Sequence, residues 1–164
     1  MSDAAGSGRA LVIGLGHDDR CDDGAGLDVV RWLRQQPNVP ADLREGPGDL
    51  SALLEVWTDH RYVVLVDAMR SGARPGEVRR WEQDEALALP AAVTVSSHGL
   101  ALPDVLRLAR DLHRLPEHIV VFGIEASTTG YGRERSPRIR AAVPIVARRI
   151  LEELAAGPRS ARDA

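Results

Sequence analysis

Three short, largely apolar runs constrain the fold of this chain more than any other feature of its sequence. They cover residues 10–14, 62–66 and 118–124, and longer stretches of mixed polarity separate them. Strands that are apolar along their whole length are typical of a central parallel sheet with helices on both faces. The alternation predicts an α/β fold, a three-layer α/β/α sandwich around a mostly parallel, twisted sheet of about five strands.

The other predicted elements lie between these runs. Apolar residues recur at helical spacing after Gly24, Asp49, His98 and Ser136. Asp49 and Ser136 are expected to cap their helices, with a proline in the first turn after Ser136 and a kink at Pro144. Further strands are expected near residues 42–44 and 92–95, and at 77–81, where the chain should return antiparallel at the sheet edge.

The length of the chain fits one domain. A chain of 164 residues buries roughly 70% of the surface that its unfolded form exposes, which is enough for a self-sufficient core. Small and polar residues dominate both ends. We therefore expect a single domain over residues 9–156 with flexible termini at 1–8 and 157–164.

Composition excludes several classes of protein. The net charge is −3, and the 21 basic residues are scattered rather than gathered in a stripe, so no nucleic-acid partner is expected. The single cysteine, Cys21, cannot form an intramolecular disulfide, and no apolar stretch approaches the roughly 20 residues of a membrane span. The N-terminus has no signal-like segment. We expect a cytoplasmic protein, and a monomer, although nothing specifies the oligomeric state.

Reactive side chains follow the ends of the predicted strands. The loop at residues 14–24 is rich in glycine and aspartate, Asp67 ends the run 62–66, and His98 precedes a predicted helix. In open α/β sheets, ligands bind beyond the carboxyl ends of the parallel strands. We therefore expect Asp23, Asp67 and His98 to converge at one edge of the sheet.

Two carboxylates and an imidazole suit a borderline divalent ion such as nickel or zinc better than calcium or magnesium. Three protein ligands leave coordination positions open, as a catalytic or substrate-shared metal requires. The sequence cannot build a closed structural zinc site, because it has one cysteine. The set therefore predicts an open metal-binding site.

Each of these residues also has a plainer interpretation. Asp67 is of a kind that often caps the next helix or closes a turn, and Asp22 or Asp23 is well placed to cap the helix after Gly24. A single histidine at a helix start is more often a hydrogen-bonding group than a ligand. The shared position at strand ends favours the metal-binding interpretation.

Other motifs carry weaker signals. Gly14-Leu-Gly16 is half of a dinucleotide fingerprint, but Asp19 stands where the third glycine is needed. Ser96 and Ser97 lack the G-x-S-x-G context of a serine hydrolase, and Cys21 lies in an acidic loop that disfavours its thiolate.

Two further groups of charged residues have surface roles as their default interpretation. Glu125 is a fourth acidic candidate at the end of the last strand, where a surface or capping role is favoured. We expect solvent exposure for four arginines after it, with contact to a protein partner as the alternative: Arg133, Arg135, Arg138 and Arg140.

Five segments together resemble the hydrogenase maturation proteases. They are Leu11-Val-Ile-Gly-Leu-Gly16, Asp22-Asp-Gly-Ala-Gly26, Leu65-Val-Asp-Ala-Met-Arg-Ser-Gly72, Ser97-His-Gly-Leu100 and Val120-Val-Phe-Gly-Ile-Glu125. The resemblance covers nearly all of residues 9–154, which makes it far more specific than any single glycine motif.

The resemblance implies an endopeptidase that removes a C-terminal extension from the large-subunit precursor of a nickel-iron hydrogenase after nickel insertion. The family's metal-contacting and catalytic positions correspond to Asp23, where many members have glutamate, to Asp67 and to His98. Nickel then belongs to the substrate, and no resident cofactor is expected. His17 departs from the family, which usually has asparagine there, and adds an imidazole that puts the detailed metal geometry in question.

Two other functions fit part of the same pattern. A non-catalytic nickel-sensing or escort protein for the hydrogenase precursor would use the same residues without cutting. A peptidyl-tRNA hydrolase-like enzyme also begins with a strand and Gly-Leu-Gly, but it would want a basic RNA-binding face, which this sequence lacks.

Overall fold

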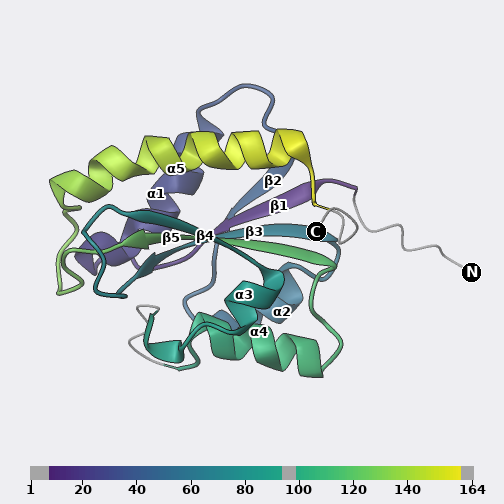
Figure 1. Cartoon of the computed structure of the whole chain (residues 1–164). Coiled ribbons are helices and arrows are strands. Elements are labelled where there is room, and N and C mark those ends of the chain that lie inside the picture. The colour runs from purple at the N-terminus through teal and green to yellow at the C-terminus, as the bar shows by residue number, and fades with distance from the viewer. Residues whose placement is uncertain (1–7, 94–98, 160–164) are drawn as a thin grey trace, which may run out of the picture.

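A five-stranded, mostly parallel sheet forms the centre of the computed structural model, which describes residues 8–93 and 99–159 (Figure 1). The strand order is β2-β1-β3-β5-β4, and only β4, at one edge, is antiparallel to its neighbour. The strands are β1 (Ala10–Gly14), β2 (Ala41–Glu45), β3 (Tyr62–Met69), β4 (Val78–Glu82) and β5 (His118–Glu125). The predicted fold class and the antiparallel edge strand are confirmed.

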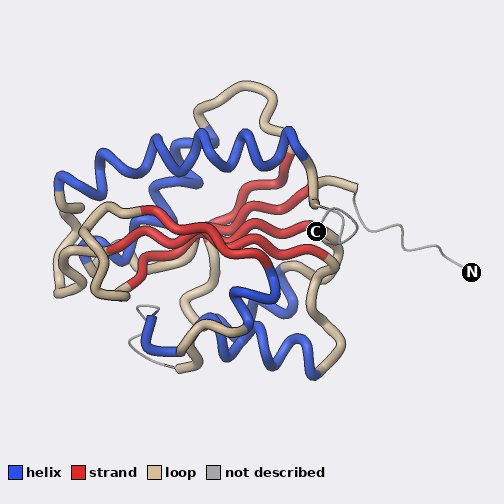
Figure 2. Tube along the Cα trace, in the orientation of Figure 1, coloured by secondary structure: helices blue, strands red, loops and turns tan. Residues whose placement is uncertain are grey.

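Helices cover both faces of the sheet (Figures 1 and 2). The helices α1 (Ala25–Arg34) and α5 (Pro137–Ala156) pack together on one face, while α2 (Leu53–Val56), α3 (Gln83–Leu87) and α4 (Leu102–Asp111) cover the other. Short 3-10 turns precede two of these helices: η1 (Cys21–Gly24) precedes α1, and η2 (Leu50–Ala52) precedes α2. A third turn, η3 (Ala91–Val93), lies between α3 and α4. None of the helices in the described ranges is long and apolar enough to cross a membrane.

Alternation along the strands divides the core into two layers. Val12, Val64 and Phe122 belong to the cluster under α1 and α5. Leu11 and Leu65, one residue earlier or later, belong to the cluster under the other helices. Successive strand side chains point to opposite faces, so strands that are apolar at every position bury both faces.

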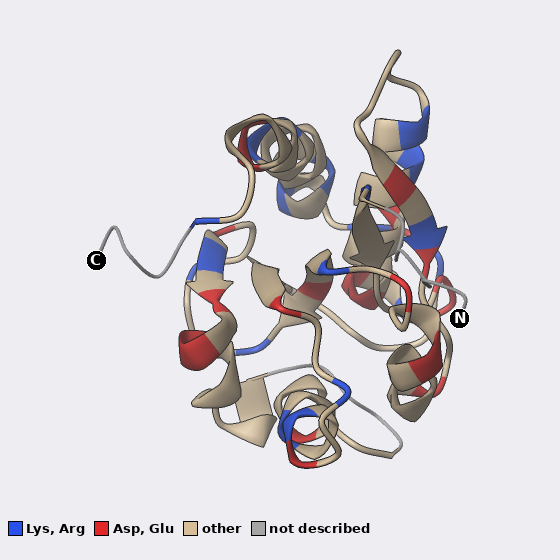
Figure 3. Ribbon diagram, turned by 90° about the vertical axis from the view of Figure 1, so that its right-hand side faces the viewer, with Lys and Arg blue, Asp and Glu red and all other residues tan. Residues whose placement is uncertain are grey.

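Figure 3 shows acidic and basic residues spread over both helical layers rather than gathered in a stripe.

The predicted strand at residues 92–95 is wrong for its described part. Ala91–Val93 forms a 3-10 turn, residues 94 and 95 lie outside the described ranges, and the unpredicted helix α3 precedes the turn. The β-branched residues suggested a strand, but the Val93 carbonyl accepts a single hydrogen bond from Arg70 N–H (2.7 Å) after β3 has ended. Strand propensity is a weak preference that tertiary context overrides.

The predicted helix caps are half confirmed. The Asp49 carboxylate accepts a hydrogen bond from Ser51 N–H (3.0 Å) at the start of η2, as a capping residue does. Ser136 stands at the N-cap of α5 with Pro137 in the first turn, but its hydroxyl bonds to Asp22 instead of capping the helix. The helix is continuous through Pro144.

The start of α1 lies unusually close to the sheet. A Cβ atom at Gly26 would overlap the carbonyl oxygens of Val66 and Leu15. The Leu15 N–H also donates to the Val66 carbonyl (2.8 Å), so the loop after β1 is bound directly to β3. These contacts leave room only for glycine at this turn of the helix.

Gly26→Ala is therefore expected to lower the free energy of unfolding by about 1 to 3 kcal/mol, the usual effect of overpacking. Alanine's better helix propensity would act in the opposite direction by about 1 kcal/mol, so a net loss identifies the close contact as the cause. Urea denaturation measures the difference. Gly48→Ala is the control, because its Cβ would meet only His17, at 3.6 Å. Equal stability of the two variants would contradict the prediction.

Candidate active site

Asp67 lies on the part of β3 that extends beyond its neighbour β1. β1 ends with Gly14 opposite Val66, whereas β3 continues along β5, with Asp67 opposite Gly123. Asp67 was expected to end its strand, but the strand runs two residues further, so the carboxylate neither caps a helix nor closes a turn. It is instead a buried strand residue at the carboxyl edge of the sheet.

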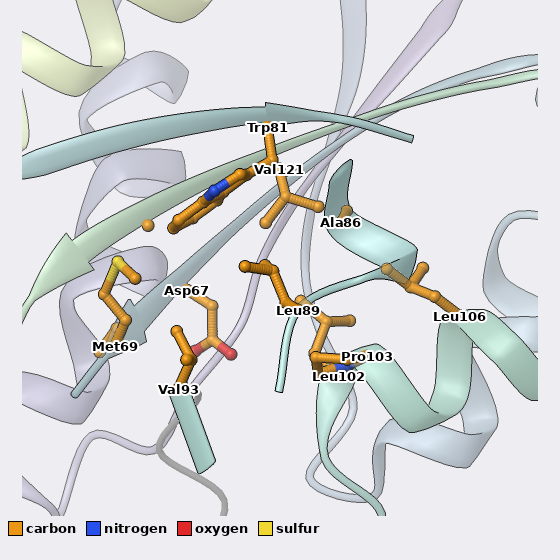
Figure 4. A pocket seen from close by; sticks show the side chains of 12 residues that line it. Asp67, Met69, Trp81, Ala86, Leu89, Val93, Leu102, Pro103, Leu106 and Val121 are labelled. Carbon is orange, nitrogen blue, oxygen red and sulfur yellow. The ribbon is translucent and has the colours of Figure 1, made fainter. Parts of the chain in front are cut away.

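The Asp67 side chain faces a narrow, apolar pocket between the sheet and the helices α3 and α4 (Figure 4). Asp67 is 6% exposed and is the only ionisable side chain among the described residues that line this pocket. The apolar residues of the lining include Met69, Trp81, Leu89, Val93, Leu102 and Leu106. A carboxylate in such surroundings loses its hydration without gaining a partner cation.

Asp23 approaches Asp67 from the loop after β1. It lies in η1, immediately before α1, and is 2% exposed. Its Oδ2 accepts a hydrogen bond from the backbone N–H of His17 (2.9 Å), and no side chain caps α1, so the capping interpretation of Asp22 and Asp23 is wrong. Asp23 and Asp67 lie close enough for their charges to repel.

This environment raises the pKa of both carboxyl groups. For Asp67, burial is the main cause and the neighbouring charge of Asp23 adds to it, so its pKa lies well above the ordinary value despite a hydrogen bond from Ala68 N–H. Burial also raises the pKa of Asp23, but His17, Arg20 and Arg135 oppose the shift. The pair therefore favours a shared proton or cation, with Asp67 the stronger proton acceptor.

Asp22, the sequence neighbour of Asp23, has a different role. Its carboxylate accepts hydrogen bonds from the N–H groups of Ser127 (2.8 Å), Thr128 (3.1 Å) and Ser136 (2.7 Å) and from the Ser136 hydroxyl (2.9 Å). Burial alone would raise the pKa of Asp22, but these hydrogen bonds outweigh it and the pKa is lowered. Asp22 stays ionised and joins the loop after β1 to the loop after β5.

Glu125 is also occupied outside the carboxylate pair. It is 3% exposed and accepts hydrogen bonds from Ser71 N–H (2.9 Å), the Ser71 hydroxyl (2.8 Å) and Gly72 N–H (3.1 Å). It therefore holds the turn between β3 and β4. The expected surface position is wrong, and the capping alternative describes its contacts better.

Among the four arginines expected to be solvated, Arg135 is the exception that sequence reasoning missed. Its side chain is only 8% exposed and donates to Asp18, Asp28 and the Cys21 carbonyl. Arg133, in the same loop, is exposed and pairs with Asp19, as expected for a surface residue. No local pattern distinguishes the two, because burial of Arg135 depends on residues more than 100 positions away.

The third expected ligand, His98, lies outside the described residues, as do Ser96 and Ser97. Across residues 8–93 and 99–159, no three His, Cys, Asp or Glu side chains are grouped so that they could hold a metal ion. Asp23 and Asp67 supply two carboxylates whose mutual repulsion a divalent cation would relieve. Their chemistry fits such an ion, and completing the site requires further ligands.

Asp67→Asn is expected to make the protein more stable at neutral pH, because it replaces a carboxyl group whose ionised form is disfavoured by burial and by Asp23. A group whose folded-state pKa is raised contributes stability at low pH that is lost as the pH rises. The advantage of the variant should therefore be small near about pH 4 and grow toward pH 8, by about 1.4 kcal/mol per unit of pKa difference. Urea denaturation across this range measures it, and a pH-independent difference would contradict the shift.

Comparison with known proteins identifies the family. The hydrogenase maturation protease family, HycI, matches residues 33–153. The hydrogenase expression/formation protein HupD of Thiocapsa roseopersicina is 28% identical over 148 residues, which cover 88% of this chain and 67% of that protein. The NiFe hydrogenase maturation protease HybD from Thermococcus kodakarensis has 28% identity and a TM-score of 0.73, over 88% of this chain and 97% of that one.

The fold agrees with a second solved structure. The hydrogenase maturating endopeptidase HybD from E. coli superimposes with a TM-score of 0.78 over 90% of this chain and 93% of that one, at 24% identity. The family match covers well over half of the chain, including strand β3 with Asp67. The chain therefore belongs to the hydrogenase maturation protease family and is a hydrolase of the endopeptidase class.

Proposed function

We propose that this chain removes the C-terminal extension from the large-subunit precursor of a nickel-iron hydrogenase once nickel has been inserted. Its membership of the hydrogenase maturation proteases supports the substrate class. The observation that carries the choice of site is the buried pair Asp23 and Asp67, because two adjacent carboxyl groups of raised pKa attract a cation or a proton. In this proposal the protein works in the cytoplasm as a monomer and holds no cofactor of its own.

Nickel is part of the substrate in this proposal. Asp23 and Asp67, with His98 as the third ligand, contact the metal while the precursor supplies its remaining ligands. Binding displaces the proton that Asp67 favours, and the cation in turn relieves the repulsion between the two carboxylates. The site thereby distinguishes a nickel-loaded precursor from an empty one, because an empty precursor supplies no cation to take the place of that proton.

Cleavage is the hydrolysis of one peptide bond. Water adds to the scissile carbonyl carbon, the bond to the amide nitrogen breaks, and the nitrogen takes up a proton to leave as the new N-terminus of the released tail. The bound metal polarises the carbonyl or the water, and a carboxylate of the pair assists the proton transfer. The apolar pocket beside Asp67 limits competition from bulk water for the charged groups.

The proposal is tested by mixing the purified chain with nickel-loaded and nickel-free precursor and measuring intact masses. We expect the mass of the tail to be lost only from the nickel-loaded precursor. A stable complex with no loss of mass would instead identify an escort protein. No interaction with either precursor would contradict the hydrogenase substrate.

Asp67→Asn is expected to abolish processing while the fold is retained, because asparagine keeps the size of the side chain and loses its charge. A loss of about 100-fold or more in the cleavage rate is expected for a group that contacts the reacting centre. Asp59→Asn is the matched control, since Asp59 is exposed and precedes β3 at the opposite end of the sheet. Circular dichroism verifies folding, and full activity of Asp67→Asn would refute the assignment.

A further inference from the structure

The segment that carries Asp23 is bound to a distant part of the chain, the loop between β5 and α5. Cys21 N–H donates to the Gly132 carbonyl (2.7 Å), and Gly132 N–H donates to the Asp19 carbonyl (2.9 Å). Asp22 N–H donates to the Thr128 carbonyl (3.0 Å). The two loops therefore pair like short strands, and the loop between β5 and α5 fixes the position of η1.

Two buried charges reinforce this pairing from opposite sides. Asp22, from the first loop, accepts hydrogen bonds from the second. Arg135, from the second loop, donates to the first: to the Cys21 carbonyl (2.9 Å) and to the carboxylates of Asp18 (2.8 Å) and Asp28 (2.9 Å). Arg135 alone of the two is a cation, so it alone can oppose the negative charge of Asp23.

The Arg135 guanidinium lies directly against η1. A Cβ atom at Gly24 would overlap the guanidinium, so a larger residue there would displace the arginine from this position. Gly24 directly follows Asp23, and Cys21, whose carbonyl accepts a hydrogen bond from Arg135, lies two residues before Asp23. Arg135 therefore holds the turn on both sides of the Asp23 carboxylate, and its positive charge acts on that carboxylate.

We propose that Arg135 is a positioning residue that holds Asp23 at the distance from Asp67 at which the two carboxylates bind the metal of the substrate. The inference rests on the proposed function, since it assigns Arg135 to the same site. Arg135 does not touch the substrate. It acts through the backbone of η1, because its planar fork binds a carbonyl oxygen and two carboxylates at once, which a lysine cannot reproduce.

A second arginine next to Asp18 and Asp28 allows the positioning role of Arg135 to be distinguished from a purely structural one. Arg31 also binds Asp18, through two hydrogen bonds (2.8 and 2.7 Å), and contacts Asp28 (3.5 Å). Both carboxylates therefore keep a cation when Arg135 is replaced, whereas the Cys21 carbonyl loses its hydrogen bond from the Arg135 side chain. We expect the loss to fall on the geometry of η1 more than on global stability.

The test compares Arg135→Gln and Arg135→Lys with Arg133→Gln, which removes a positive charge from the same loop without touching η1. Cleavage of the nickel-loaded precursor is followed as kcat and KM, and thermal denaturation verifies that each variant is folded at the assay temperature. Misplacement of a catalytic group by about 1 Å costs on the order of 100-fold in rate. We expect kcat of Arg135→Gln to fall by about 10- to 100-fold with KM within about twofold, Arg135→Lys to recover part of the loss, and Arg133→Gln to match the parent protein.

A second measurement does not depend on cleavage. Nickel binding to the purified chain is measured by calorimetry, with Asp23→Asn to show which binding requires Asp23. Arg135→Gln should weaken that binding about tenfold or more, as the loss of a residue that orients a metal ligand does, and Arg133→Gln should not change it. If the parent protein binds nickel through Asp23 but does not cut the precursor, the proposed function fails and the calorimetry alone decides the role of Arg135.

Three outcomes would overturn the inference. One is an unchanged kcat in a folded Arg135→Gln variant. Another is a loss of activity that merely follows the fraction of unfolded protein, which would make Arg135 a stabilising residue only. The third is a parent protein that neither cleaves the precursor nor binds nickel through Asp23, since Asp23 would then have no ligand for which to be positioned.

Discussion

The first turn of α1 packs directly on the backbone of β1 and β3, and the geometry of the site depends on that contact. Because Gly26 has no side chain, the helix approaches the carbonyl oxygens of Leu15 and Val66 to a distance that any Cβ would prevent. The turn that precedes the helix is thereby brought against β3 at the point where β1 has ended. Asp23 consequently reaches Asp67, although 43 intervening residues of the chain separate them.

The electrostatics of the site follow from this packing. Asp67 is enclosed by apolar side chains, whereas Asp23 lies on a loop where basic groups gather. Positive charges therefore lower the pKa of Asp23, whereas no positive charge contributes to the pKa shift of Asp67. An unequal pair of this kind couples cation binding to proton release, because Asp67 holds its proton to a higher pH than an ordinary carboxyl group and a bound cation takes the place of that proton.

Much of the scaffold could be predicted from local pattern. The runs at 10–14, 62–66 and 118–124 proved to be strands because burial of both strand faces demands apolar residues at every position. The strand at 92–95 failed in its described part, since Val93 has β propensity but no neighbouring strand to pair with. The surface positions predicted for Arg135 and Glu125 were wrong for a related reason. The hydrogen-bond partners that hold each side chain in the interior include residues at least 50 positions away, and local sequence patterns do not reveal such contacts.

The α/β class, the residue types of the site and the strand ends near which they lie follow from the amino-acid sequence, because they depend on hydrophobic period and on residue chemistry. Which acidic residues lie near one another depends instead on how distant segments pack. Asp22 and Asp23 are neighbours of identical chemistry, yet the carboxylate of Asp22 accepts four hydrogen bonds from the loop after β5, while the charge of Asp23 acts on Asp67. The direction in which a side chain points from a turn is set by the distant segments packed on that turn, and local sequence carries no measure of them.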